Sequence, residues 1–195
     1  MSLSINFENI EQKCVAAAET KEYDLLVEKV KKAKKIFLIG NGGLHFVANH
    51  MATDLTRLIE NKVVYSFESV GFITSNANDH GFEKMFVRWL ETVCAVENPD
   101  DCLIIGLSCS GNSSNVVRSL HWGHKNNFPT FLISGQKSLA LKDEVDQLCF
   151  NCEYFHTVEV MCLMVFYDLI HRVGSHCPPI TEEKKRMADS PLRKV

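Results

Sequence analysis

The sequence predicts an α/β fold of three layers, in which a parallel sheet of five strands lies between helices. Short apolar runs alternate with longer stretches whose apolar residues recur at helical spacing. Two of the apolar runs are followed at once by a polar turn, one rich in glycine and one rich in serine. Because the carboxyl ends of parallel strands meet at one edge of a sheet, we expect both turns to contribute to a ligand site there.

The 195 residues suit a single domain, with an N-terminal helix in residues 1–34, an α/β core in 35–174 and a tail in 175–195. Hydrophobic residues make up 46% and charged residues 23%, which is typical of soluble globular proteins. The net charge of −3 gives no support to a nucleic-acid-binding surface. We see neither a signal peptide nor the roughly 20 apolar residues of a membrane span, so we expect a cytoplasmic protein without nucleic-acid or membrane partners.

The first element is an amphipathic helical stretch over residues 7–33, and it carries more apolar positions than one small sheet requires. We expect it to pack on another helix or on another subunit. A polar loop is expected at 75–81. Strands are expected at 36–39, 63–67, 102–107, 128–133 and 147–152, and further helices at 46–61, 82–95, 116–122, 138–143 and 156–173.

The eight cysteines are expected to be free thiols. Cys94, Cys102, Cys149 and Cys162 lie within or beside apolar segments, where a reduced thiol behaves as a small hydrophobic side chain. Cys149 and Cys152 have the spacing of half a zinc site, but no second pair lies at a matching distance. If this segment is a strand, positions i and i+3 also face opposite sides of the sheet.

The serine-rich turn covers residues 108–115, which read Ser-Cys-Ser-Gly-Asn-Ser-Ser-Asn and separate a strand from a helix. Ser113 or Ser114 can cap that helix, and the free backbone N–H groups of its first turn then point towards the loop. A helix N-terminus with several hydroxyls and neither Lys nor Arg suits the phosphate monoester of a small molecule. Four serines, one glycine and two asparagines in eight residues exceed what capping alone requires.

The glycine-rich turn is Gly40-Asn41-Gly42-Gly43, directly after the first expected strand. Three glycines in four positions permit backbone conformations that other residues avoid, and they allow a ligand to approach closely. The turn has neither the GxGxxG spacing of a dinucleotide site nor the GxxxxGK[ST] spacing of a P-loop, so nucleotide hydrolysis is not expected.

Taken together, the glycine turn, the 108–113 loop and the Asn-Asp pair between them resemble the sugar isomerase (SIS) domain. Within that family the chain looks most similar to the phosphoheptose isomerases and to the DnaA initiator-associating protein, from about residue 6 to residue 170. The resemblance implies a five-stranded flavodoxin-like sheet, a phosphosugar ligand and a homotetramer built partly on the first helix. It also implies a substrate-binding set, which comprises Asn41, Gly42, Gly43, Asn78, Asp79, Ser108, Cys109, Ser110 and Ser113.

Two positions of these turns depart from the family pattern. Leu44 stands where a serine usually follows the two glycines, and Cys109 stands where the phosphate loop usually has Thr or Ser. We expect the remaining loop serines and the helix N-terminus to hold a phosphate without them.

The resemblance also implies catalytic residues. In phosphoheptose isomerases a His and a Glu on the helix after the glycine turn join a Gln and a His from the last long helix, and some members bind zinc with them. This chain keeps His50 and has Asp54 in place of the Glu, so the two lie at i and i+4 on one helix face. Asp54 is expected to be the base of an enediol mechanism, with His50 or His156 as the acid.

The last helix can be aligned with the family in two ways. With Glu159 as the anchor, Val158 and Phe166 occupy the Gln and His positions; with the Asp-Leu-Ile sequence further along as the anchor, His156 and Met164 do. In both alignments an apolar residue replaces the second catalytic His.

Two functions are consistent with these observations. The first is a phosphosugar isomerase that acts on sedoheptulose 7-phosphate or a related ketose phosphate. The second is a phosphosugar-binding or regulatory scaffold protein that keeps the fold and the phosphate loop but has lost turnover. We expect no cofactor in either case, and zinc is not expected because two of the four family ligand positions are altered.

Overall fold

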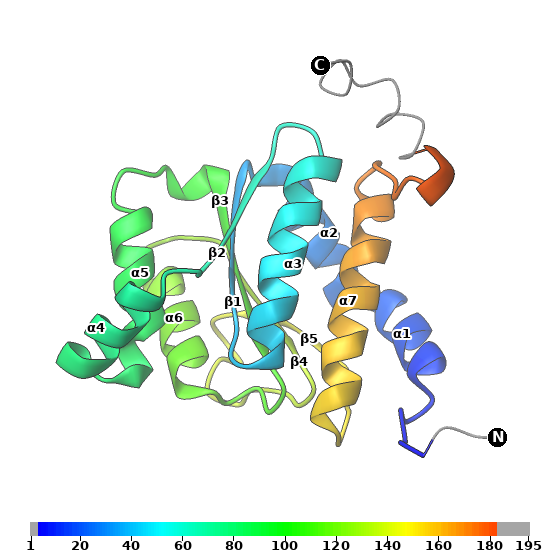
Figure 1. Cartoon of the computed structure of the whole chain (residues 1–195), viewed down its shortest axis with the longest axis horizontal. Coiled ribbons are helices and arrows are strands. Elements are labelled where there is room, and N and C mark those ends of the chain that lie inside the picture. Colours follow the sequence, from blue (N-terminus) through cyan, green and yellow to red (C-terminus); the bar gives the residue numbers. More distant parts are fainter. Residues whose placement is uncertain (1–3, 183–195) are drawn as a thin grey trace, which may run out of the picture.

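The computed structural model describes residues 4–182 and contains a sheet of five parallel strands between helical layers (Figure 1). The order across the sheet is β2-β1-β3-β4-β5, and every neighbouring pair is parallel. The predicted α/β fold class is therefore confirmed, and four of the five strands lie where the apolar runs predict them. The fifth strand ends at Cys149 rather than at residue 152, so Cys152 lies beyond it. The strands are β1 (Lys35–Ile39), β2 (Val63–Ser66), β3 (Cys102–Ser108), β4 (Thr130–Ser134) and β5 (Asp146–Cys149).

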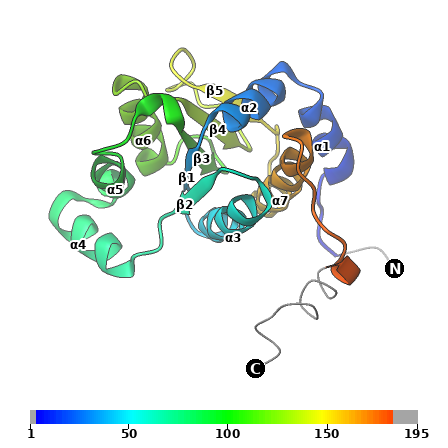
Figure 2. The ribbon, with the colours of Figure 1, turned by 90° about the horizontal axis from the view of Figure 1, so that it is seen from above.

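The helices pack on both sides of this sheet, and each side has its own apolar cluster (Figure 2). One layer consists of α1 (Ile10–Ala18), α2 (Lys21–Lys32), α3 (Gly43–Leu58) and α7 (Phe155–Arg172). The other consists of α4 (Val70–His80), α5 (Met85–Val93) and α6 (Ser114–Lys125), with short 3-10 turns at Phe82–Lys84 and Pro99–Asp101. The central strand β3 is buried along its whole length between the two layers. Within residues 4–182 we find no helix that is both long and apolar enough to cross a membrane.

The N-terminal stretch is two helices rather than the single helix expected over residues 7–33. Thr20 separates them with an extended backbone, and its Oγ1 accepts a hydrogen bond of 3.2 Å from the N–H of Tyr23. A threonine in this conformation is a typical N-cap, so it starts a new helix where the apolar periodicity alone shows no break.

The prediction of a polar loop at 75–81 is also wrong, because residues 70–80 form the helix α4. Ser69 caps this helix by accepting a hydrogen bond of 3.2 Å from the N–H of Phe72. Thr74, Ser75 and Asn76 each donate to a carbonyl of the same helix three or four residues earlier. Their polar groups are therefore satisfied within the helix, although such residues are more common in turns.

The short helix expected at 138–143 is a series of turns instead. Gln147 accepts from the backbone N–H of Ser138 at 2.9 Å and donates to the carbonyl of Ser138 at 3.0 Å. Because this side chain takes both backbone groups of Ser138, they are not available to begin a helix. The charged end of the tail, residues 183–195, lies outside the described residues.

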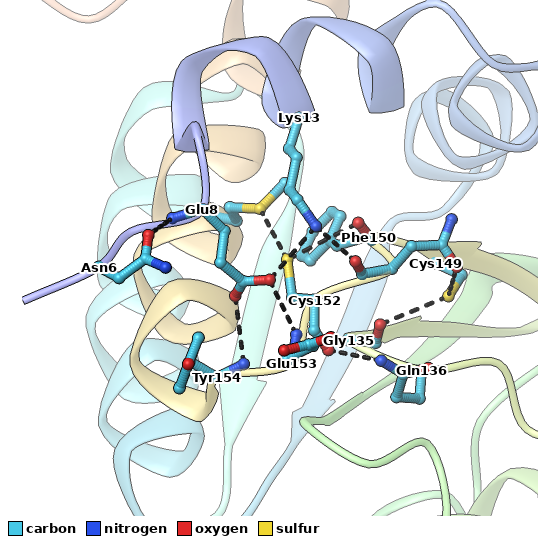
Figure 3. Close-up of polar contacts among 12 residues, drawn as sticks. Asn6, Glu8, Lys13, Gly135, Gln136, Cys149, Phe150, Cys152, Glu153 and Tyr154 are labelled. Carbon is cyan, nitrogen blue, oxygen red and sulfur yellow. Dashed lines mark hydrogen bonds and ion pairs between the residues drawn. The ribbon is translucent and has the colours of Figure 1, made fainter.

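The N-terminal segment forms hydrogen bonds with the loop between β5 and α7 (Figure 3). Glu8 accepts hydrogen bonds from the backbone N–H groups of Glu153 and Tyr154, at 3.0 and 3.2 Å, just before α7 begins. Lys13 forms an ion pair with Glu8 and donates to the carbonyl of Asn151. Since α7 has no capping side chain of its own, Glu8 supplies the anion that a helix N-terminus favours.

Candidate functional site

The two predicted turns meet at the carboxyl edge of the sheet, as the parallel topology requires. β1 and β3 are neighbours, and a pair of amides joins the segments that follow them. Asn41 donates to Oδ1 of Asn115 at 2.8 Å, and Asn115 donates back to Oδ1 of Asn41 at 2.9 Å. The amide of Asn41 therefore fixes the first turn against the start of α6. Asn115 is 1% exposed, and the sequence-based set of site residues does not include it.

The serine-rich turn surrounds the N-terminus of α6. Ser108 is buried at the end of β3, and its hydroxyl lies 3.0 Å from that of Ser113, the N-cap residue. Ser110 and Ser114 are exposed. Among the described residues nothing accepts from the N–H groups of Ser114 and Asn115 at the start of the helix. Donors of both kinds, hydroxyl and backbone N–H, thus gather at the positive end of a helix dipole.

Glycines hold this turn close to its neighbours. Gly111 has a φ of +70°, and a Cβ there would overlap the backbone carbonyl oxygen of Gln136. At Gly135 a Cβ would lie 2.5 Å from Val158 and 2.6 Å from the carbonyl oxygen of Cys109. The loop after β4 therefore packs directly on the backbone of the serine-rich turn, with no room for side chains between them.

Glu159 is a residue of this region that the predicted site does not contain. Its carboxylate lies against Gly43, in the space that a Cβ at position 43 would need. Burial, together with the nearby charge of Glu159, raises the pKa of Cys109 to about 11, so Cys109 is a neutral thiol at physiological pH. Leu44 is 2% exposed and packs in the core, so it does not line the turn.

Asn78 and Asp79 are not brought to the two turns within this chain. Both are exposed on α4, and Asn78 donates to Asp79 at 2.8 Å. In residues 4–182 no hydrogen bond links either side chain to the serine-rich or the glycine-rich turn. The two residues lie on the helix that replaces the expected loop, and none of the residues of that helix is buried.

A second polar group lies on the facing sides of α3 and α7. Nε2 of His50 is 3.6 Å from Oδ2 of Asp54, which confirms that these two residues face the same way. The hydroxyl of Tyr167 lies 2.8 Å from Nε2 of His50 and donates to Oδ2 of Asp54 at 2.9 Å. Nε of Arg57 donates to Oδ1 of Asp54 at 2.8 Å. Asp54 is 6% exposed, whereas the side chain of His50 is 54% exposed.

Tyr167 is the residue of this group that the sequence reasoning missed. It follows Phe166, the position of the second catalytic His in the alignment anchored on Glu159. In that alignment Phe166 is fully buried, and the next residue presents its hydroxyl to His50 and Asp54. Burial, and then the hydrogen bond to Asp54, raise the pKa of Tyr167, so its hydroxyl keeps its proton at neutral pH.

The residues of the other alignment point elsewhere. Nε2 of His156 lies 2.9 Å from the carbonyl oxygen of Asn6, and its ring packs edge-on against Phe7. Met164 faces α1, where its sulfur is 3.7 Å from that of Cys14. Neither side chain bonds to His50 or Asp54, so neither supplies a proton to them.

The side chains at the positions that the sequence resemblance assigns to a zinc site do not suit a metal. Val158 and Phe166 are buried apolar residues, and the cationic Arg57 already bonds to Asp54. Across residues 4–182 no group of three or more His, Cys, Asp and Glu side chains is arranged to hold a metal. Cys149 and Cys152 bond to different neighbours, the carbonyls of Gly135 and Phe150 among them (Figure 3).

The chain is similar in sequence to phosphoheptose isomerases. It is 26% identical over 152 residues to that of Buchnera aphidicola subsp. Acyrthosiphon pisum, which covers 75% of this chain and 77% of the relative. It is 31% identical over 126 residues to that of Shigella dysenteriae, covering 63% and 64% of the two chains. No protein-family model matches the chain.

Solved structures show the same fold at lower sequence identity. The phosphoheptose isomerase of Neisseria gonorrhoeae superimposes with a TM-score of 0.72 at 18% identity, over 86% of this chain and 92% of that one. The sugar isomerase domain of a Sphaerobacter thermophilus RpiR transcription factor gives 0.61 at 17% identity, over 96% and 92%. A Vibrio vulnificus NanR protein complexed with ManNAc-6P gives 0.59 at 18% identity, over 95% and 66%. The five-stranded parallel sheet is therefore the flavodoxin-like sheet of the sugar isomerase fold.

Proposed function

Because the chain is similar in sequence to phosphoheptose isomerases and has the sugar isomerase fold, we propose that it binds a sugar phosphate at the carboxyl edge of its sheet. The observation that carries the proposal is the serine-rich turn at the N-terminus of α6. It offers hydroxyls from Ser110 and Ser113 together with N–H groups that have no carbonyl partner within residues 4–182. Phosphate monoesters bind well to such a set of donors at the positive end of a helix dipole.

We place the sugar beyond the phosphate, along α3. Glu159 lies at Gly43, beside the serine-rich turn, and its carboxylate can accept hydrogen bonds from sugar hydroxyls. His50 is seven residues further along α3, about 10 Å at 1.5 Å per residue. A sugar chain of several carbons can span that distance, so a ketose phosphate such as sedoheptulose 7-phosphate could reach both the turn and His50.

At His50 and Asp54 we propose the proton transfer of an aldose–ketose isomerisation. This reaction moves a proton between neighbouring carbons through an enediol, and it requires a base near the carbon. The exposed ring of His50 and the carboxylate of Asp54 are the titratable groups on that part of α3. We propose no cofactor, because only two of the four zinc-ligand positions keep a side chain that can bind the metal.

One observation favours a second candidate, a phosphosugar-binding protein without turnover. Phe166 lies in the core and Met164 packs against α1, so neither alignment of the last helix supplies the second His. Loss of one acid or base group typically slows an enzyme by about 100- to 10,000-fold. We therefore expect slow isomerisation, with phosphate binding retained.

Binding is tested by a thermal-shift panel of sugar phosphates, since a ligand that binds only the folded state raises its melting temperature. The Ser110→Ala variant should weaken the best ligand about 5- to 30-fold in calorimetric titration, as expected for one lost hydroxyl donor. Thr92→Ala is the control, because the hydroxyl of Thr92 bonds only within α5, to the carbonyl of Arg88 at 3.0 Å. Equal losses in both variants, or no loss in Ser110→Ala, would contradict the proposal.

Turnover is tested by incubating the protein with sedoheptulose 7-phosphate and following aldose formation. We expect rates well below the usual enzymatic range of about 1–1,000 per second. A rate inside that range would rule out the binding-only candidate. It would also show that the last-helix His is dispensable.

We also propose a homotetramer in the cytoplasm. Val15, Leu25 and Val160, from the N-terminal helices and α7, are apolar residues that are 54%, 45% and 37% exposed in the single chain. A neighbouring subunit could cover them, and α4 could carry Asn78 and Asp79 to a neighbour's site. The eight free thiols suit a reducing compartment. Native mass spectrometry at micromolar concentration should show the tetramer, and a monomer would contradict it.

A further inference from the structure

The hydrogen bonds between α3 and α7 have only one possible direction. Asp54 as a carboxylate can only accept hydrogen bonds, and its Oδ1 already accepts from Nε of Arg57 at 2.8 Å. Its Oδ2 is 2.9 Å from the hydroxyl of Tyr167, so the phenolic proton must lie between these two oxygens. Because that hydroxyl has a single proton, Tyr167 has none left to donate to another group.

The bond to Tyr167 also fixes the proton on His50. Nε2 of His50 lies 2.8 Å from the hydroxyl oxygen of Tyr167, which can only accept from it. Nε2 therefore carries the ring proton of the neutral imidazole, and the lone pair is on Nδ1. Within the described part of the chain nothing bonds to Nδ1, and the side chain is 54% exposed.

We propose that Asp54 and Tyr167 are positioning residues that hold His50 in the Nε2–H tautomer, so that Nδ1 of His50 is the base for the isomerisation. This inference rests on the proposed function for its substrate. It also exchanges the roles expected from the sequence, in which Asp54 is the base. A carboxylate that is 6% exposed and has a donor on each oxygen is poorly placed to reach a carbon-bound proton.

The proton transfer balances within the substrate and His50. Nδ1 takes a proton from the carbon beside the carbonyl; the C–H electron pair becomes the C=C bond, and the carbonyl electron pair moves to its oxygen. The proton on Nδ1 then passes to the former carbonyl carbon, where the C=C electron pair forms the new C–H bond. The hydroxyl proton moves to the adjacent substrate oxygen, and the electron pair that it leaves forms the new C=O bond. His50 ends neutral, with the same tautomer that it had at the start.

Tyr167 takes over part of the role of the missing His of the last helix. Phe166 occupies the aligned position in the core, and the hydroxyl of the next residue reaches Asp54 and His50 instead. Because burial and the bond to Asp54 raise the pKa of Tyr167, its proton stays in place at neutral pH. A phenol held in this way orients the imidazole but does not itself act as the base.

The Asp54→Asn variant tests whether this hydrogen-bond network fixes the tautomer of His50, and the rate of proton exchange in the substrate tests whether that tautomer serves the reaction. Arg57 must bond to an acceptor, so it keeps the amide oxygen at the Oδ1 position and leaves the amide nitrogen facing Tyr167. That nitrogen donates to the tyrosine oxygen, and the tyrosine proton turns towards Nε2 of His50. The neutral ring must then carry its proton on Nδ1, as in serine proteases whose triad Asp is changed to Asn.

The tautomer is read from long-range proton–nitrogen NMR spectra of the full protein labelled with nitrogen-15 histidine, without ligand. The pH is set about two units above the ordinary His pKa of about 6.5, and the His50→Gln variant identifies the signals. We expect Nε2–H in the wild type and Nδ1–H in Asp54→Asn. The Nδ1–H form in the wild type, or an unchanged tautomer in Asp54→Asn, would overturn the inference.

Two further variants test the part played by Tyr167. Tyr167→Phe removes the acceptor of Nε2, so the His50 signals should move towards those of a histidine in the unfolded protein; unchanged signals would contradict the inference. Tyr23→Phe is the matched control, because it removes a hydroxyl that donates at 2.7 Å to Asp168, the residue after Tyr167, and it should leave His50 unchanged.

The rate of proton abstraction from the substrate provides a test that does not depend on the NMR spectra. Incorporation of deuterium from heavy water beside the carbonyl of sedoheptulose 7-phosphate reports proton abstraction even when net turnover is slow. We expect Asp54→Asn and Tyr167→Phe to lower this rate at least about 10-fold while thermal shifts with the ligand stay unchanged. If the tautomers behave as expected but no sugar phosphate binds, the proposed function fails and the assignment of the His50 proton holds.

Discussion

The two halves of the candidate site are built in different ways. The turns after β1 and β3 consist of residues that follow a strand directly, so their place at the edge of the sheet is set by local chain geometry. The α3–α7 face instead joins side chains far apart in the sequence, since Asp54 and Tyr167 are 113 positions apart. In the turns the backbone fixes the place of each residue, Cys109 included. On the helices the hydroxyl that reaches His50 comes from Tyr167, the residue after Phe166.

This difference suggests which part of such a site is tolerant of change. A phosphate is held by several donors at once, and backbone N–H groups contribute without regard to side-chain identity. Proton transfer depends on single groups at defined positions, so the loss of one His must be offset by a neighbour or the rate falls.

Gly111→Ala should have the largest effect, on the turns. The residue has a φ of +70°, and its new Cβ would overlap the carbonyl oxygen of Gln136, so the serine-rich turn must change shape. We expect the affinity for a sugar phosphate to fall at least about 100-fold, equivalent to losing two hydrogen bonds to a charged group. Calorimetric titration measures this loss.

Gly174→Ala is the control for backbone strain. Its φ is +97°, but a Cβ there meets open space, and the residue follows α7 at the far end from the turns. It should lower stability and leave binding unchanged. If both glycine variants lose affinity to the same extent, general destabilisation explains the effect.

Asn115→Ala should have the next largest effect, on the link between the two turns. It removes both hydrogen bonds of the amide pair and leaves the side chain of Asn41 without its partner. We expect the free energy of unfolding to fall by about 1–3 kcal/mol. Urea denaturation measures this change. In the control Asn126→Ala, an exposed amide loses one bond of 2.8 Å to the carbonyl of Trp122, and an equally large loss there would contradict the account.

The sequence predicted the strands and the two turns well because each is a local signal. The buried run 102–107 and the serine-rich stretch after it both lie in the structure where the pattern indicates. The pattern failed where side chains satisfied the backbone in unexpected ways. Thr20 divides the first helix, polar residues 74–76 bond within α4, and Gln147 prevents a helix at Ser138.

The α3–α7 face could be predicted only in part. The spacing of His50 and Asp54 on one helix was enough to place them together. The partner on α7 depends on how two helices lie side by side, and the sequence left two alignments open. Tyr167 and Glu159 are recognised only when that packing is known, because neither has a distinctive spacing from residues on α3.

Glu8→Gln acts on the α7 half of the site and should have a smaller effect. Hydrogen bonds from the N–H groups of Glu153 and Tyr154 lower the pKa of Glu8 in the folded protein. Because the pKa of Glu8 is lower in the folded than in the unfolded protein, ionised Glu8 stabilises the fold at pH values above the ordinary Glu pKa of about 4.3. This stabilisation is lost as the pH falls through the pKa that Glu8 has in the folded protein. At pH 7 we expect the variant to be less stable by about 1 kcal/mol, which is typical of a lost helix cap.

Unfolding curves at several pH values test the sign of this effect. The difference between wild type and Glu8→Gln should be constant above about pH 5 and should shrink at lower pH. A difference that grows on acidification would contradict the assigned direction. Glu60→Gln, at an exposed glutamate, is the control.

Cys109→Ser should have the smallest effect, and it should raise the affinity for a sugar phosphate rather than lower it. Cys109 is a neutral thiol, because burial and Glu159 raise its pKa to about 11, and a thiol is a weak donor. A hydroxyl at the same position adds a stronger donor to the serine-rich turn, so we expect the sugar phosphate to bind about 3- to 5-fold more tightly. Weaker binding would show that position 109 does not face the phosphate.

The most direct test of the account is to follow backbone amide signals while sedoheptulose 7-phosphate is added to the labelled protein. We expect the largest shifts on residues 108–116, at the turn before α6, and on residues 41–43, with smaller shifts around His50 and none on α5. Shifts confined to other surfaces, or none at saturating ligand, would contradict the claim that the N-terminus of α6 holds the phosphate.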